Sequence, residues 1–120
     1  MDIILVIGRV LFGGYFVYSA YNHFAHSAPL AGYAASKGVP MARAAVLGSG
    51  LLIFVGGLSI LLAVRPALGA WALILFLIPV TLMMHAFWME EGDAKAAQKI
   101  AFGKNTALLG ASLMIISLYR

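Results

Sequence analysis

Six polar side chains at the ends of long apolar runs are the best candidates for chemistry in this sequence. They are Asn22, His23, His85, Trp88, Lys104 and Asn105. Imidazole exchanges protons near neutral pH, and ammonium and amide groups donate hydrogen bonds to carbonyl oxygens. Such a set could hold the head of a quinone by its carbonyls, or exchange protons with it. The spacing of the histidines carries no metal-ligand signature, so we expect no metal site.

Arg9 is a further binding candidate, because it lies about two helical turns into the first apolar run. Its long side chain could extend to the membrane–water interface. It could instead be an internal cation that binds an anionic headgroup or a carbonyl. The residues leave both interpretations open. In either case the last apolar run could bring Tyr119 near Arg9 on the same face.

The apolar runs contain no recognisable catalytic motif. They carry no carboxylate, and their glycines lack the context of a phosphate-binding loop. Their serines stand outside any nucleophile motif: Ser19, Ser49, Ser59, Ser112 and Ser117. Cysteine is absent, which excludes disulfides and thiolate chemistry in this chain. We therefore predict no catalytic residue, and no catalytic activity of the chain on its own.

Composition indicates what must position these side chains. Of the 120 residues, 63% are hydrophobic and 10% are charged, whereas soluble domains average about 45–50% and about 25%. A small soluble fold cannot bury that much apolar surface. The net charge of +4 comes from basic residues scattered singly, which is typical of membrane-span flanks rather than of a nucleic-acid site. We expect the lipid bilayer, and no nucleic acid, as a partner.

Four apolar blocks, residues 3–24, 44–64, 67–89 and 100–119, approach the ~20 residues that a helix needs to cross a bilayer. Backbone groups must be paired inside lipid, so each block is predicted to be a helix. The first lacks the basic start of a signal peptide, which favours a retained helix. We predict one all-α membrane domain over residues 1–120, an antiparallel four-transmembrane-helix bundle. A short interfacial segment over 30–37, ended by Gly38, is expected between helices 1 and 2.

Small residues should bring these helices together, because close contact drives helix association in lipid. The helix-packing candidates are Gly13, Gly14, Ser49, Gly50, Gly56 and Gly57. The tight Arg65-Pro66 turn makes the second and third helices neighbours. Antiparallel threading then brings the six polar candidates to one membrane face. That face also has more lysine and arginine, which predicts cytoplasmic loops and termini outside.

Motifs along the chain resemble the DoxX family of small four-helix bacterial membrane proteins. They are Ile-Gly-Arg-Val-Leu-Phe-Gly-Gly at 7–14, Gly-Val-Pro at 38–40, Gly-Gly-Leu-Ser at 56–59, Pro-Val-Thr at 79–81, His-Ala-Phe-Trp at 85–88, Phe-Gly-Lys-Asn at 102–105 and Ala-Leu-Leu-Gly at 107–110. Two departures stand out. A glutamate common before the double glycine is missing from 51–55, and the lysine common near the end of the first helix is replaced by Asn22-His23. The missing carboxylate puts proton-coupled redox work in doubt.

The resemblance implies an integral protein of the bacterial cytoplasmic (inner) membrane. The family takes its name from a subunit associated with thiosulfate:quinone oxidoreductase, and other relatives are tied to redox-stress complexes or to the maturation of partner proteins. We expect an accessory or structural subunit of a membrane complex linked to quinone or redox metabolism, with other subunits or a second copy as partners. Quinone is the candidate cofactor. Alternatives are a quinone-reactive oxidoreductase subunit with His85 and His23 as proton carriers, a membrane-protein assembly factor and, last, a small transporter.

Overall fold

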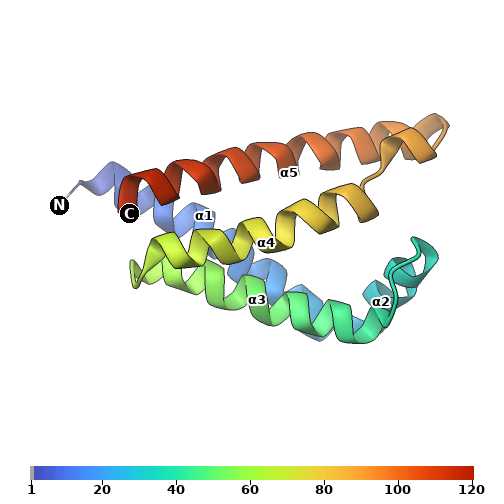
Figure 1. The fold of residues 1–120 in the computed structure, drawn as a ribbon, viewed down its shortest axis with the longest axis horizontal. Coiled ribbons are helices and arrows are strands. Elements are labelled where there is room, and N and C mark those ends of the chain that lie inside the picture. The colour runs from blue at the N-terminus through green and yellow to red at the C-terminus, as the bar shows by residue number, and fades with distance from the viewer. Residues whose placement is uncertain (1) are drawn as a thin grey trace.

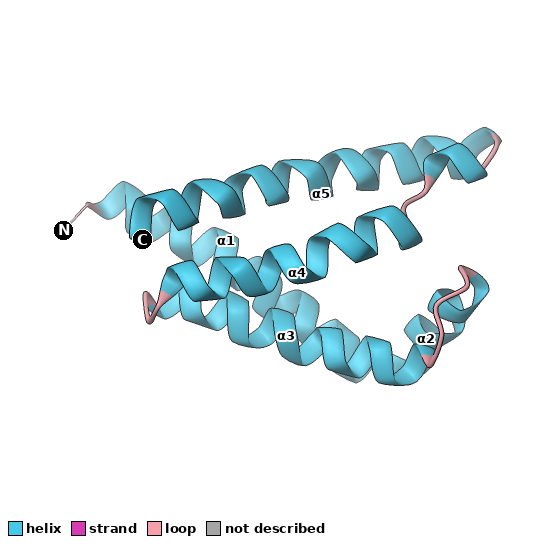
Figure 2. Cartoon of the chain, in the orientation of Figure 1, coloured by secondary structure: helices cyan, strands magenta, loops and turns pink. Residues whose placement is uncertain are grey.

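The structure is a computed structural model that describes residues 2–120. Its elements are α1 (Ile3–Ala25), α2 (Ser27–Ser36), α3 (Ala42–Leu62), α4 (Pro66–Met84), the 3-10 helix η1 (Phe87–Met89) and α5 (Gly92–Tyr119). The described chain is all-helical and has no strand, as predicted (Figure 2). The helices α1, α3, α4 extended through η1, and α5 are long and apolar enough to cross a membrane.

The elements are distributed between two ends of an elongated molecule (Figure 1). The start of α1, the turn between α3 and α4, and the end of α5 lie together, and we call this the terminal end. The opposite end, the loop end, carries α2 and the connection from α4 to α5. The main packing contacts run from α1 to α3, from α3 to α4 and from α4 to α5, while α2 packs on α3.

Glycines allow α1, α3 and α4 to approach one another closely. A Cβ on Gly13 would lie 2.6 Å from the carbonyl oxygen of Gly57, and one on Gly56 would lie 2.9 Å from that of Gly69. Gly50 is equally close to α1, where an added Cβ would lie 2.8 Å from the Cβ of His23. A cluster of buried side chains continues these contacts: Phe16, Ala20, Ile53, Ile60, Ala70, Leu73 and Leu77. Gly14 is different, since a Cβ there would meet nothing within 4 Å.

Two helix boundaries agree with simple capping rules. Asp2 caps α1, because its carboxylate accepts a hydrogen bond of 2.9 Å from the backbone N–H of Ile4. Between α3 and α4, Ala63 and Arg65 adopt left-handed conformations with φ of 59° and 50°. Pro66 then occupies the first turn of α4, where its missing N–H costs nothing. The tight turn predicted at Arg65-Pro66 is therefore present.

Other boundaries differ from the apolar blocks. The third block was expected to continue to residue 89, but α4 ends at Met84 and only a 3-10 turn follows. The last helix begins at Gly92 rather than near residue 100. Its 28 residues span about 42 Å, more than the ~30 Å of hydrocarbon, so its polar first turns extend beyond the apolar block. The short helix α2 forms three residues earlier than the predicted segment, and Gly38 follows it with a φ of +85°.

Candidate functional site

The six polar candidates come from α1, from the segment between α4 and α5, and from the middle of α5, and each has its own surroundings. His23 donates from Nδ1 to the carbonyl oxygen of Ser19 at 2.8 Å. Lys104 donates from Nζ to the hydroxyl of Tyr15 at 2.9 Å and so joins α5 to α1. Within residues 2–120, no hydrogen bond, ion pair or ring contact joins two of the six.

The remaining candidates are also separate. The ring of Trp88 packs edge-on against Phe102 with centroids 5.9 Å apart, and the indole is 53% exposed. Asn105 is buried in α5, and Asn22 is half-buried near the end of α1. The structure thus divides the predicted cluster, with His23 in an apolar cavity and His85 in a polar network.

The first of these sites is a cavity of about 350 Å³ between α3 and α4, to whose lining α1 and α2 also contribute. We call it the α3–α4 cavity. Among its described lining residues, His23 and Ser49 carry the polar side chains, and the rest are apolar or glycine. Its lining includes Leu75 and Met83, whose side chains are 66% and 42% exposed. Because these residues face outward from the bundle, an apolar ligand could reach the cavity from the bilayer.

The hydrogen bonds within the cavity wall determine which of its atoms can still accept a hydrogen bond from a ligand. A carbonyl oxygen can only accept, so the bond to Ser19 requires the proton of neutral His23 on Nδ1 and makes Nε2 an acceptor. Ser49 uses its proton in a 3.1 Å bond to the carbonyl of Val46, which leaves its oxygen as an acceptor. Pro79 lacks an N–H, so the carbonyl of Leu75 loses its helical donor at this wall. The cavity therefore offers acceptors to a ligand that carries hydrogen-bond donors.

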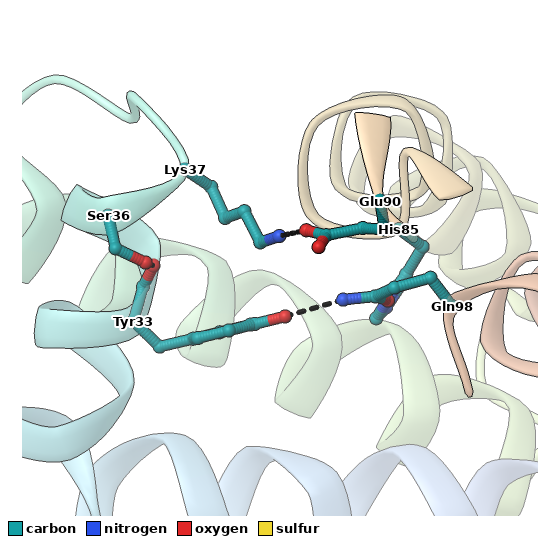
Figure 3. A network of polar contacts seen from close by, with 6 residues as sticks. All are labelled: Tyr33, Ser36, Lys37, His85, Glu90 and Gln98. Carbon is teal, nitrogen blue, oxygen red and sulfur yellow. Dashed lines mark hydrogen bonds and ion pairs between the residues drawn. The ribbon is translucent and has the colours of Figure 1, made fainter. Parts of the chain in front are cut away.

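The second site is a polar network at the loop end, the α2–α5 bridge, made of Tyr33, Lys37, His85, Glu90 and Gln98 (Figure 3). Gln98 accepts from His85 Nδ1 at 2.8 Å and donates to the hydroxyl of Tyr33 at 2.6 Å. Lys37 forms an ion pair with Glu90. The Lys37–Glu90 pair connects the end of α2 to the α4–α5 connection, and the Tyr33–Gln98 hydrogen bond connects α2 to the early turns of α5 (Figure 3).

Electrostatics favour the charged form of Lys37. Its hydrogen bond to Glu90 raises the pKa of the ammonium group above the ordinary value of 10.5. Partial desolvation opposes this shift, while the charges of Tyr33 and Glu90 add to it. The ion pair is partly solvated, with side chains 20% and 26% exposed, so screening by water keeps its contribution small.

Sequence reasoning missed four members of this bridge: Tyr33, Lys37, Glu90 and Gln98. Lys37 and Glu90 are 53 residues apart, and Tyr33 and Gln98 are 65 apart. No local motif joins positions at such separations. The available signal was the opposite charge of two loops that were already expected on the same membrane face.

Arg9 and Tyr119 lie elsewhere, in a groove between α1 and α5 at the terminal end. Gly13, Gly50, Gly56 and Gly57 lie at the helix contacts described above, whereas Ser49 lines the α3–α4 cavity. Within residues 2–120, no group of three or more histidine, cysteine, aspartate or glutamate side chains could hold a metal ion.

Four membrane-length helices, three of which line a laterally open cavity, define a polytopic helical membrane protein. The chain belongs to the DoxX family, because the DoxX family model matches residues 4–86, from α1 to the end of α4. The motifs of the last helix at 102–110 lie beyond the matched residues, so their resemblance stays an expectation. No curated protein matches the sequence, and no solved structure does.

Proposed function

We propose that this DoxX protein is an accessory subunit of a membrane complex linked to quinone or redox metabolism, and that its α3–α4 cavity binds the quinone. The complex would lie in the bacterial cytoplasmic membrane, with the four long helices crossing it in alternate directions. The observation that carries the proposal is the chemistry of the cavity wall. His23 and Ser49 line an otherwise apolar space, and their hydrogen bonds to Ser19 and Val46 leave one acceptor on each side chain.

Size and access support a lipophilic ligand. The volume of about 350 Å³ falls within the roughly 300–1,000 Å³ of small-molecule pockets. The exposed side chains of Leu75 and Met83 at the wall give a route from the hydrocarbon. An isoprenoid tail could remain in the bilayer through this route while the ring occupies the cavity.

The hydrogen-bonding pattern favours the reduced form of the ligand. A hydroquinone carries two O–H donors, which match the acceptors of the wall while His23 is neutral. The oxidised form carries only carbonyl acceptors. The cavity wall offers this form a donor only when His23 carries a proton on Nε2. In this proposal the chain holds the ligand, and a partner subunit with a redox centre exchanges the electrons.

Filling the cavity tests the proposal. Gly48 lines the cavity, and a Cβ there would meet nothing within 4 Å, so Gly48→Leu adds bulk without a backbone clash. We expect the purified variant to bind a short-tailed hydroquinone about tenfold more weakly than the unaltered chain in equilibrium dialysis. Gly110→Leu is the matched control, since Gly110 is equally open and lies outside the cavity lining. Equal binding by the two variants would overturn the proposal.

The subunit role has its own test. Purification in a mild detergent should recover the chain with a larger membrane complex that contains a redox centre. Recovery as an isolated chain would contradict the accessory role while leaving the quinone-binding result unaffected. An assembly factor that contacts partner helices through glycine faces fits less well, because Gly13, Gly56 and Gly57 are occupied by contacts within the bundle.

A quinone-reactive oxidoreductase subunit is the second candidate, and the α2–α5 bridge favours it. Gln98 accepts from Nδ1 of His85 and so orients the imidazole with Nε2 free to exchange a proton directly with a ligand or with water. This role predicts that His85→Ala abolishes quinone-dependent turnover of the complex without weakening hydroquinone binding. Unchanged turnover would exclude His85 as a proton carrier.

A further inference from the structure

The groove at the terminal end points to a second binding site, independent of the proposed function. We propose that Arg9 and Tyr119 bind the phosphate of an anionic phospholipid, with an acyl chain lying along the groove between α1 and α5. The groove has a volume of about 720 Å³. Apart from Arg9, Tyr119 and Ser117, its described lining residues have apolar side chains or are glycine.

Two polar atoms in the groove are free to bind an external acceptor. Nε of Arg9 and the hydroxyl of Tyr119 are both buried, and neither has a hydrogen-bond partner within residues 2–120. Guanidinium has only donors and keeps its charge at any physiological pH. A buried charged donor without an acceptor is costly, so an acceptor from outside the chain would stabilise this arrangement.

Within residues 2–120, no carboxylate forms an ion pair with Arg9. Asp2 is the acidic residue nearest to Arg9 in the sequence, and its carboxylate is engaged by the backbone N–H groups of Ile4 and Leu5. The other acidic residues, Glu90, Glu91 and Asp93, belong to the α4–α5 connection and the start of α5, at the loop end. Because Arg65 and Arg120 also lie at the terminal end, the charge there favours an anionic ligand.

Helix direction explains why the two side chains share one level. Side chains of a helix lean toward its N-terminus. Arg9 lies about 9 Å from the start of α1, so its side chain leans back toward the terminal end. Tyr119 ends α5, so its side chain leans inward along the bundle. The start of α1 and the end of α5 lie together in Figure 1, and both side chains line the same groove.

The rest of the groove suits an acyl chain. Gly8 lines it beside Arg9, and a Cβ at Gly8 would meet nothing within 4 Å. An amphiphile with a phosphate head and a hydrocarbon tail matches one cationic end and an apolar floor. A zwitterionic lipid fits less well, because its ammonium group would lie in the field of the arginines at this end.

Native mass spectrometry of the delipidated full chain tests the site, with phosphatidylglycerol and phosphatidylcholine of the same acyl chains as probes. We expect one phosphatidylglycerol to bind at least about tenfold more tightly than phosphatidylcholine. Arg9→Gln should remove this preference, and Tyr119→Phe should reduce it. Arg65→Gln, which removes the same charge at the same end but outside the groove, should retain most of it.

A steric variant keeps the proposal testable should Arg9→Gln fold poorly. Gly8→Leu fills the groove, leaves the charge in place and should lower binding of both lipids, while circular dichroism confirms the helical content. Inorganic phosphate at millimolar concentration should not displace the lipid. Equal binding of the two lipids, an Arg9→Gln variant that retains the preference, or displacement by phosphate alone would each overturn the proposal.

Discussion

At the scale of single residues, alanine substitutions at two neighbouring glycines of α1 should change the free energy of unfolding in opposite directions. Gly13→Ala places a Cβ 2.6 Å from the carbonyl oxygen of Gly57, so α1 and α3 must move apart. We expect a loss of about 1–3 kcal/mol in the free energy of unfolding. Gly14→Ala meets nothing and should be neutral or stabilising by up to about 1 kcal/mol, because alanine favours helix. Thermal unfolding in one detergent compares them directly.

A second prediction at this scale concerns the acceptor that His23 offers to the α3–α4 cavity. His23→Phe retains a ring against Phe76, whose centroid lies 5.9 Å away, but removes the Nε2 acceptor. We expect weaker hydroquinone binding, because one acceptor of the wall is lost. Equilibrium dialysis against the unaltered chain measures the difference. A variant with unaltered affinity would show that the imidazole takes no part in binding.

At the scale of elements, sequence patterns predicted the parts of the fold that lipid dictates. The four apolar blocks became four long helices, because apolar length is what a bilayer selects. The turn at Arg65-Pro66 and the role of Gly38 followed from backbone restrictions that act within a few residues. The contacts of the α2–α5 bridge could not be predicted from the sequence. Hydropathy does not indicate that α5 begins at Gly92, nor that this start brings Gln98 next to Tyr33.

The same bridge yields a prediction about α2. Glu90→Gln removes the ion-pair partner of Lys37 and should increase hydrogen exchange of the backbone amides of α2, with Glu91→Gln as the control. The raised pKa of Lys37 sets the sign of the pH dependence. The contribution of the pair is complete below the ordinary lysine pKa of 10.5 and is lost as pH rises through the higher folded value. The thermal midpoint of the unaltered chain should therefore fall toward that of Glu90→Gln at high pH.

At the scale of the whole molecule, the open arrangement of the helices creates two sites of different character. Packing from α1 through α3 and α4 to α5 leaves the α3–α4 cavity in the half near the loop end. It also leaves the groove between α1 and α5 at the terminal end. The first site offers acceptors and the second offers a cation and a hydroxyl donor. A neutral hydroquinone and an anionic lipid should accordingly bind without competing, and double titration of the purified chain checks this.

Charge distribution over the molecule predicts which end faces the cytoplasm. The segments at the loop end carry Lys37, Arg43, Lys95 and Lys99, whereas Lys104 lies near the middle of α5; the terminal end carries Arg9, Arg65 and Arg120. Lysine and arginine are enriched on the cytoplasmic side, so the terminal end should face outward.

The chain has no cysteine, so the labelling of a single-cysteine variant reports on that one position. An impermeant maleimide should label Val64→Cys in intact cells and Glu91→Cys only after permeabilisation. The reverse pattern would place the anionic-lipid groove in the cytoplasmic leaflet and the α2–α5 bridge outside.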